Sequence, residues 1–296
     1  MENILIYAGL FILGAAFGSF AGAQVWRLRA AQLKGDAKAG EKISAHDKKQ
    51  VKHLEHRKGV REDRSRCLHC GHSLAWYDLL PVISWLQLGG RCRYCREPIG
   101  RLEIAIELGL GLFFVGSYLF WPYGFDTFYD TARFVLWLVA SVGLAILFVY
   151  DSKWFLLPDK VTFPLIGVAA LSSALFLAQE GFTAQAFISV VTSCALLSGL
   201  YFALYYVSKG AWIGFGDIKL GLVLALLLAD WQLAVLALFL ANFIGTLIVF
   251  PLLSLKKITR ETHLPFGPLL IAGWAIAGLF GGNIIAWYLA LSLGQI

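Results

Sequence analysis

Long apolar runs dominate this chain of 296 residues, and they constrain its fold more than any other feature. A helix needs about 20 residues to cross a hydrocarbon core of about 30 Å. Eight windows approach that length, at residues 4–26, 104–120, 134–150, 161–178, 186–208, 212–229, 233–255 and 264–290. With 58% hydrophobic and 15% charged residues, the composition excludes a purely aqueous globular protein. We therefore expect an all-α polytopic membrane protein with about eight transmembrane helices.

The window at 212–229 is irregular, because Asp217 and Lys219 interrupt its apolar character. Only residues 218–229 follow the acid before Asp230, and 12 helical residues span about 18 Å, which is less than the hydrocarbon core. We expect either a short helix or a carboxyl group that lies somewhat below the membrane surface.

Positive charge is concentrated in residues 27–103, which hold 17 Lys or Arg against 9 Asp or Glu in a chain of net charge +6. Lys and Arg beside transmembrane helices favour the cytoplasmic side. We therefore expect this segment to be cytoplasmic, both termini to lie outside, and the protein to sit among membrane lipids. The same orientation brings Asp151 and Asp217 to the cytoplasmic face. The charge thus indicates orientation, and we expect no nucleic-acid partner.

The chain accordingly divides into three parts. Residues 1–26 are expected to form the first transmembrane helix. Residues 27–103 form a cytoplasmic insertion between the first and second helices, with a charged arm followed by a cysteine cluster. Residues 104–296 form a seven-helix membrane domain that carries both aspartates.

Cysteines in the insertion follow a metal-binding pattern. Two CxxC pairs are separated by 21 residues, and their members are Cys67, Cys70, Cys92 and Cys95. Four thiolates arranged as two pairs satisfy tetrahedral Zn²⁺ and leave no open position, which predicts a structural zinc site. Two alternatives stay open: the thiols bind no metal or form a redox pair, or His69 or His72 replaces one cysteine as a ligand.

The two aspartates form a candidate catalytic pair. Asp151 ends an apolar run, and Asp217 follows Gly214 and Gly216. Both acids could simply cap helices, but the two glycines permit a bend or a close approach to a substrate strand. Two carboxyl groups in a partly desolvated site do not both ionise cheaply, so one would keep a proton while the other activates water. That arrangement is typical of aspartyl peptide hydrolysis.

Motifs spread over nearly the whole chain resemble those of the type IV prepilin peptidases, which are membrane aspartyl proteases of the GxGD kind. In chain order the motifs are Gly18-Ser19-Phe20, the two CxxC pairs, Trp76-Tyr77-Asp78, Pro81-Val82-Ile83-Ser84-Trp85, Gly90-Arg91, Ile99, Glu107, Asp151 with Leu157-Pro158-Asp159, Gly214-Phe215-Gly216-Asp217-Ile218-Lys219-Leu220, and Leu264-Pro265-Phe266-Gly267-Pro268.

The resemblance implies that Asp151 and Asp217 are catalytic and that Asp159 supports the start of the next helix. It implies prepilin and pseudopilin substrates, whose leaders are cut after a glycine at the cytoplasmic face. It also implies methylation of the new amino terminus with S-adenosylmethionine as the cofactor. Residues 21–24 and 27–29 depart from the family's usual pattern, so a peptidase without methyltransferase activity is the alternative.

Several further residues of these motifs are candidates for supporting roles. Glu107 lies about one turn into the second apolar run, where an ionisable group is costly and either functions there or reaches back to the surface. Pro265 and Gly267 interrupt helix geometry, and we expect their turn to frame an extended substrate. Lys219 accompanies the aspartate in its motif.

Two other classes of function compete with the protease. A proton-coupled transporter could use the same carboxyl groups, although transporter sites usually lie near the bilayer midplane. A zinc-bearing scaffold of a pilus or secretion assembly would need no catalytic carboxyl group at all.

Overall fold

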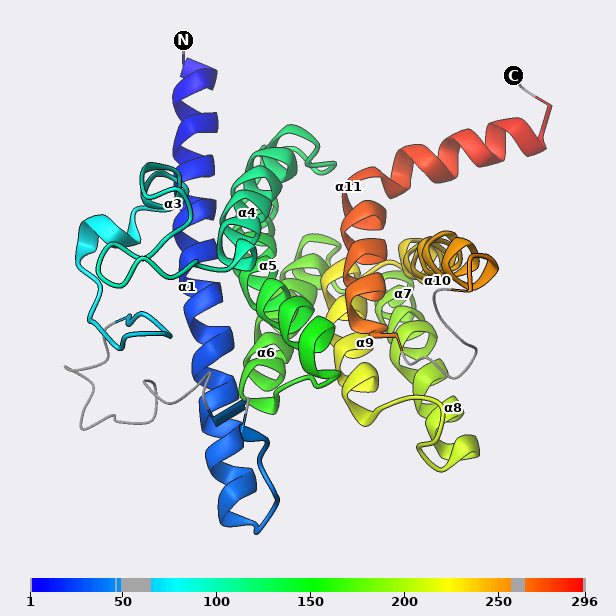
Figure 1. The fold of residues 1–296 in the computed structure, drawn as a ribbon. Coiled ribbons are helices and arrows are strands. Elements are labelled where there is room, and N and C mark those ends of the chain that lie inside the picture. The colour runs from blue at the N-terminus through cyan, green and yellow to red at the C-terminus, as the bar shows by residue number, and fades with distance from the viewer. Residues whose placement is uncertain (1, 46, 49–64, 257–263, 295–296) are drawn as a thin grey trace. The chain divides into compact units, whose positions relative to one another are not determined.

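The computed structural model describes residues 2–45, 47–48, 65–256 and 264–294, and its long elements are all α-helices (Figure 1). Within those residues, β-type pairing is limited to two isolated bridges, Arg66 with Ser73 and Arg91 with Pro98. The predicted all-α class is confirmed.

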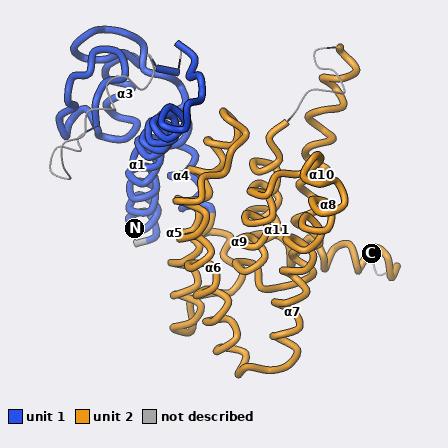
Figure 2. Tube along the Cα trace, turned by 90° about the horizontal axis from the view of Figure 1, so that it is seen from below, with its two compact units in different colours: residues 1–116 blue, residues 117–296 orange. Residues whose placement is uncertain are grey.

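The chain forms two compact units, residues 1–116 and residues 117–296, which Figure 2 colours separately. The first unit contains α1 (Glu2–Lys38), the 3-10 helix η2 (Trp76–Leu79), α3 (Ile83–Gln87) and most of α4 (Arg101–Leu119). Helix α1 continues well beyond residue 26, so the beginning of the charged segment extends the first apolar helix without a break. The rest of that segment includes residues 49–64, which lie outside the described residues.

Helices α1 and α4 pack closely because glycines remove side chains from their contact. A Cβ atom at Gly18 would lie 2.6 Å from the Cα atom of Glu107, and one at Gly14 would lie 2.6 Å from the carbonyl oxygen of Leu110. Small residues of this kind let membrane helices approach each other. The approach fixes α4 against α1 at the level of Glu107.

The second unit is a bundle of helices that surrounds one short helix. Its elements are α5 (Phe128–Trp154), α6 (Asp159–Gln179), α7 (Ala184–Cys194), the π turn η3 (Ala195–Gly199), α8 (Leu200–Ser208), α9 (Phe215–Leu228), α10 (Trp231–Ser254) and α11 (Gly267–Ser292). Helix α9 contacts α6, α7, η3, α8, α10 and α11.

Seven helical segments of the described chain are long and apolar enough to cross a membrane, and α7, η3 and α8 together make one of them. The eighth apolar window folds as α9, which has only 14 residues. Neighbouring helices cover α9, and the side chains of Leu220, Val223 and Leu224 are fully buried. A helix enclosed by protein in this way does not need to match the thickness of the lipid core.

Helix ends in the second unit follow from local sequence. Thr127 and Asp130 form a reciprocal capping box at the start of α5, and Asp230 accepts hydrogen bonds from two backbone amides at the start of α10. Helix α5 ends where Phe155 adopts a left-handed conformation with φ of 54°. The chain turns there and begins α6 at Asp159, which brings the end of α5 and the start of α6 to one end of the bundle.

Candidate functional site

Asp151 lies in the last turn of α5 and is 6% exposed. Its Oδ2 atom accepts a hydrogen bond of 3.0 Å from the backbone amide of Gly267, the first residue of α11. A Cβ atom at position 267 would lie 2.8 Å from that oxygen, so only glycine fits there without a shift. One carboxyl group is thus fixed by the backbone of a distant helix.

Asp217 lies in the first turn of α9, where its backbone amide donates to the carbonyl oxygen of Gly214 at 3.1 Å. A carboxylate in the first turn interacts favourably with the helix dipole. A Cβ atom at Gly216 would lie 3.0 Å from the Cβ atom of Leu157, so this glycine lets α9 begin close to the segment that joins α5 to α6. At Gly214 an added Cβ would have ordinary contacts, the nearest at 3.5 Å.

The two carboxyl groups belong to one neighbourhood of the second unit. They are close enough for Asp217 to act electrostatically on Asp151. Leu220, on the next turn of α9, contacts the same Gly267 that holds Asp151. The end of α5, the start of α9 and the start of α11 therefore meet around the pair.

Asp159 and Lys219 form an ion pair at the edge of this neighbourhood. The lysine ammonium also lies over two aromatic rings, 5.4 Å from the centre of Phe163 and 5.3 Å from that of Phe215. The side chain of Asp159 is 57% exposed, whereas Asp151 is buried. The pair joins the first turns of α6 and α9.

The turn before α11 contains one further contact. Phe266 packs edge-on against Tyr201 of α8, with 5.7 Å between ring centres. Tyr201 is 3% exposed, and its hydroxyl has no hydrogen-bond partner among the described residues. The sequence does not single out Tyr201, because a lone tyrosine in an apolar run carries no motif. Pro265 precedes this turn.

Glu107 belongs to the first unit and is 9% exposed. Its Oε2 atom accepts a hydrogen bond of 2.7 Å from the backbone amide of Val82, and Ser19 of α1 hydrogen-bonds to the same carboxyl group. Val82 has a left-handed φ of 62°, which is unusual for a β-branched residue. Glu107 therefore ties α1, α4 and the loop before α3 together and does not reach for the surface.

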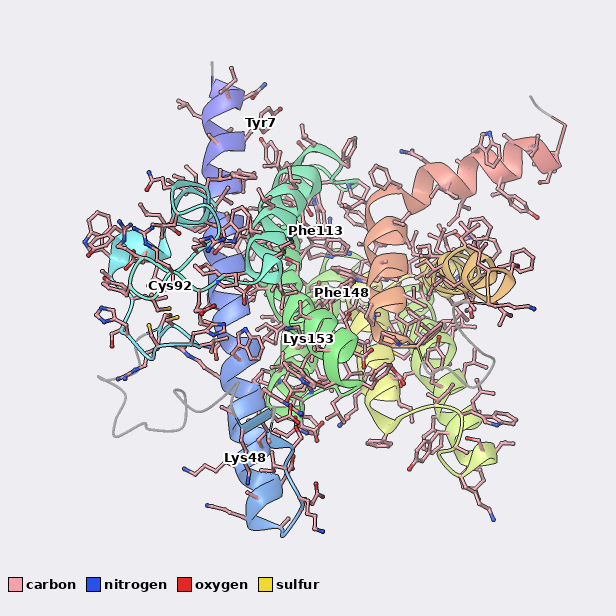
Figure 3. The ribbon with its side chains drawn as sticks, viewed as in Figure 1. Tyr7, Lys48, Cys92, Phe113, Phe148 and Lys153 are labelled. Carbon is pink, nitrogen blue, oxygen red and sulfur yellow. The ribbon has the colours of Figure 1, made fainter. Side chains whose placement is uncertain are left out.

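The four predicted cysteines come together in the first unit, and Figure 3 labels Cys92 beside their sulfur atoms. All four Sγ atoms lie within 4.8 Å of one another, and Cys67 and Cys95 are 3.8 Å apart. Zn–S bonds of about 2.3 Å place tetrahedral ligands about 3.8 Å apart, so the cluster fits a metal ion. Mainly through burial, the pKa of the Cys67 thiol is raised to about 12, and a bound cation would offset that cost.

The two CxxC turns have matching backbone geometry. Cys67 donates its amide to the carbonyl of His72, and Cys92 donates to that of Glu97. The His72 ring packs on Tyr94 with 3.6 Å between ring centres. The four thiols are therefore placed to act as metal ligands, whereas the His72 ring packs against Tyr94.

A cavity of about 230 Å³ lies beside this cluster, within the first unit. Its wall includes Trp26 and Arg27 of α1, Trp85 of α3, and Glu103 and Glu107 of α4. Trp26 donates its indole N–H to Oε1 of Glu103 at 3.2 Å. The other carboxyl oxygen of Glu103 and the indole nitrogen of Trp85 are buried without a partner among the described residues. Sequence motifs do not reveal this cavity, because its wall comes from separate segments.

Two family models match the chain. The Bacterial Peptidase A24 N-terminal domain matches residues 12–121, and the Type IV leader peptidase family matches residues 138–250. Together these matches take in the cysteine cluster, both aspartates and the glycines that precede Asp217.

Curated relatives carry the name prepilin leader peptidase/N-methyltransferase. One from Stutzerimonas stutzeri is 34% identical over 230 residues, which cover 76% of this chain and 74% of the relative. One from Aeromonas hydrophila is 34% identical over 229 residues, with the same two coverages. One from Pseudomonas putida is 30% identical over 283 residues, which cover 93% of this chain and 91% of the relative. No solved structure is significantly similar to the chain.

Proposed function

This chain belongs to the type IV leader peptidase family, and from that membership we propose that it is an aspartyl endopeptidase that removes the leaders of type IV prepilins and pseudopilins. The observation that carries the proposal is the pair Asp151 and Asp217, two acids 66 positions apart in sequence whose carboxyl groups interact within one neighbourhood of the second unit. No ordinary packing need explains two acids beside each other among apolar helices.

The two aspartates divide the work of hydrolysis. Like charges so close together in a partly buried site favour sharing one proton. The ionised carboxylate takes a proton from water, whose oxygen attacks the scissile carbonyl, while the protonated partner donates to the carbonyl oxygen. On collapse of the tetrahedral intermediate the C–N bond breaks, the leaving amine takes the proton that the first carboxyl group gained from water, and the intermediate's hydroxyl returns a proton to the second carboxylate. Gly267 keeps the Asp151 carboxyl group in position by its 3.0 Å hydrogen bond.

Supporting roles follow from the surroundings of the pair. We assign Lys219 and Asp159 to holding the first turns of α9 and α6 together. Gly216 lets α9 begin close to Leu157, and the carbonyl oxygen of Gly214 accepts the backbone amide of Asp217. The turn at Pro265 and Gly267 frames the substrate next to the carboxyl groups.

The proposed orientation places the reaction at the cytoplasmic face of the bacterial inner membrane, with both termini outside. Its support is the charge of residues 27–103, which hold 17 basic and 9 acidic residues. Prepilins present a short basic leader before an apolar helix, so their scissile bond lies at that membrane surface. Lipid is therefore a constant partner of enzyme and substrate, and the proposal includes no nucleic-acid partner.

A functional division into residues 1–26, 27–103 and 104–296 accompanies this orientation. It differs from the compact units because α1 and α4 pack on each other through Gly14 and Gly18.

We assign structural Zn²⁺ to the cluster of Cys67, Cys70, Cys92 and Cys95, since four closely grouped thiols suit zinc and leave no open position for a substrate.

The cavity beside the zinc cluster favours a second activity, methyl transfer from S-adenosylmethionine to the new amino terminus. Its wall offers a carboxyl oxygen of Glu103 that has no hydrogen-bond partner in the described part of the chain, a basic side chain at Arg27, and the rings of Trp26 and Trp85. The cofactor carries a sulfonium and an ammonium, which suit an acidic side chain, and a carboxylate, which suits a basic one. Its aromatic base suits the tryptophan rings. One water occupies about 10–15 Å³ on the same measure, so a cavity of about 230 Å³ has room for an organic molecule.

When bound, the cofactor supplies a methyl group on positively charged sulfur. Glu103 would bind the positive end of the cofactor, Trp85 would offer its buried indole N–H as a donor, and Arg27 would pair with the carboxylate. A peptidase without methyl transfer is the alternative that the departures at residues 21–24 and 27–29 favour.

Incubation of the purified protein with a prepilin tests the proposed function. Wild-type protein is expected to release the leader, and Asp151→Asn and Asp217→Asn are expected to release none. Asp126→Asn is a suitable control, because Asp126 lies in the connection between α4 and α5. A folded wild-type protein that never cuts, yet carries protons through vesicles in a manner that needs both acids, would favour the transporter.

A further inference from the structure

Tyr201 is a buried tyrosine near the start of α8. The side chain is 3% exposed, and its hydroxyl oxygen has no hydrogen-bond partner among the described residues. Buried hydroxyl groups are normally paired, because an unpaired one pays for desolvation without a compensating bond. The unpaired hydroxyl is therefore a candidate donor to a bound ligand.

The tyrosine is linked to the surroundings of both aspartates. Its hydroxyl experiences the charge of Asp217, and its ring meets Phe266 edge-on at 5.7 Å between ring centres. Phe266 immediately precedes Gly267, whose amide holds Asp151. The hydroxyl thus belongs to the same neighbourhood as the two carboxyl groups.

A π turn sets the position of this tyrosine. Residues Ala195–Gly199 form the π turn η3, and Tyr201 follows directly in α8. Ser198 of this turn donates a hydrogen bond of 2.9 Å to the carbonyl of Ile218, the residue after Asp217. Gly221 of α9 also packs against the backbone of Leu197. Turns of this kind are often found at functional sites, and this one ties the start of α8 to the first turns of α9.

We propose that the Tyr201 hydroxyl is a third catalytic group, which donates a hydrogen bond to the scissile carbonyl oxygen of the substrate as that oxygen gains negative charge. The proposal rests on the aspartyl peptidase function proposed above. A donor that is already in place, buried and unpaired needs no reorganisation when charge develops, and such donors stabilise transition states most effectively. The two carboxyl groups exchange protons with water, the carbonyl oxygen and the amine, whereas the tyrosine keeps its proton and only donates a hydrogen bond to the same oxygen.

Replacing Tyr201 with phenylalanine removes the hydroxyl and keeps the ring against Phe266. Because the hydroxyl has no partner, the variant is expected to unfold at the same temperature as wild type or at a higher one. Its rate constant kcat for prepilin cleavage is expected to fall about 100-fold, as for loss of one donor in an oxyanion hole, with KM nearly unchanged. Tyr206→Phe is the matched control, because Tyr206 lies on the same helix and is 77% exposed.

The affinities of two peptides distinguish a catalytic role of the Tyr201 hydroxyl from a structural one. A prepilin peptide with a secondary alcohol in place of the scissile carbonyl mimics the tetrahedral intermediate, and Tyr201→Phe is expected to weaken its binding about 100-fold. Binding of an uncleaved prepilin peptide is expected to remain at the wild-type level.

A variant that cleaves at the wild-type rate and binds the alcohol peptide normally would overturn the role of Tyr201 while leaving the aspartyl mechanism intact. A lower unfolding temperature with equal weakening of both peptides would also overturn it, because the hydroxyl would then support the fold. Failure of the wild-type protein itself to cut prepilin would instead refute the proposed function.

Discussion

The backbone amide of Gly267 donates a hydrogen bond of 3.0 Å to Oδ2 of Asp151, and 116 positions of sequence separate the two residues. This contact joins the first residue of α11 to the last turn of α5. It holds a buried carboxyl group without using a second side chain, so the orientation of the Asp151 carboxyl group depends on where α11 begins.

Replacing Gly267 with alanine should therefore damage activity more than stability. A Cβ atom there would lie 2.8 Å from Asp151 Oδ2 and would displace the carboxyl group. We expect prepilin cleavage to fall at least about 100-fold, since small displacements of catalytic groups have effects of that size. Overpacking should cost about 1–3 kcal/mol in the free energy of unfolding.

Gly282→Ala is the control for this variant, because Gly282 lies in the same helix and an added Cβ would meet nothing within 4 Å. Cleavage kinetics and thermal unfolding in detergent measure both effects. Wild-type cleavage by Gly267→Ala would show that the contact to Asp151 has no part in catalysis.

Loss of the ion pair between Asp159 and Lys219 should have a smaller effect. The Asp159 side chain is 57% exposed, and exposed ion pairs contribute about 0–1 kcal/mol. Asp159→Asn is expected to keep cleavage within about tenfold of wild type, while Asp217→Asn abolishes it. Steady-state cleavage rates of the two variants distinguish a supporting acid from a catalytic one, and complete loss in Asp159→Asn would contradict that assignment.

Metal analysis of the purified protein should find about one zinc ion per chain, in line with a single four-thiolate site. Cys67→Ser is expected to lower the zinc content and the unfolding temperature, because the three remaining thiols no longer complete the ligand set of a shared cation. Cys194→Ser is the control, since Cys194 ends α7 in the second unit and is outside the cluster. A fully folded protein without metal would disprove the structural zinc site.

Glu103→Gln should weaken binding of S-adenosylmethionine without affecting leader cleavage. The substitution removes a negative charge from the wall of the cavity and keeps the shape of the side chain. A loss of one desolvated charge contact corresponds to about tenfold or more in affinity.

Isothermal titration calorimetry with the cofactor measures this affinity directly, and Glu180→Gln, at the end of α6 in the second unit, is the control. If Glu103→Gln and Glu180→Gln bind the cofactor with equal affinity, the assignment of the cofactor to this cavity is wrong. Absence of binding to the wild-type protein would favour a peptidase without methyl transfer.

Much of this architecture could be predicted from sequence because its determinants are local. Apolar runs of sufficient length predict helices, and of the two expectations for the window broken by Asp217, α9 meets that of a short helix. The two CxxC pairs identify the thiols that come together, because each pair forms its own turn and only their meeting is long-range.

Other features depend on contacts that no local pattern contains. The sequence does not show that α1 extends to Lys38. The change from apolar to charged residues at position 27 suggests an end to the transmembrane helix, but charged residues of good helix propensity can continue the same helix in water. Neither the amide of Gly267 nor the hydroxyl of Tyr201 could be assigned to Asp151 or Asp217, since their places depend on how α8, α9 and α11 pack. Glu107 likewise finds its partner, the amide of Val82, only in the folded unit.

The most direct test of the account compares prepilin cleavage by Asp151→Asn, by Asp217→Asn and by the variant that carries both substitutions. Residues that act as one catalytic unit give single and double variants with nearly equal losses, because removal of either partner already disables the pair. We predict that each single variant loses essentially all cleavage and that the double variant is no worse, while all three remain folded. Wild-type cleavage by either single variant, or losses that multiply in the double variant, would contradict a shared aspartyl centre.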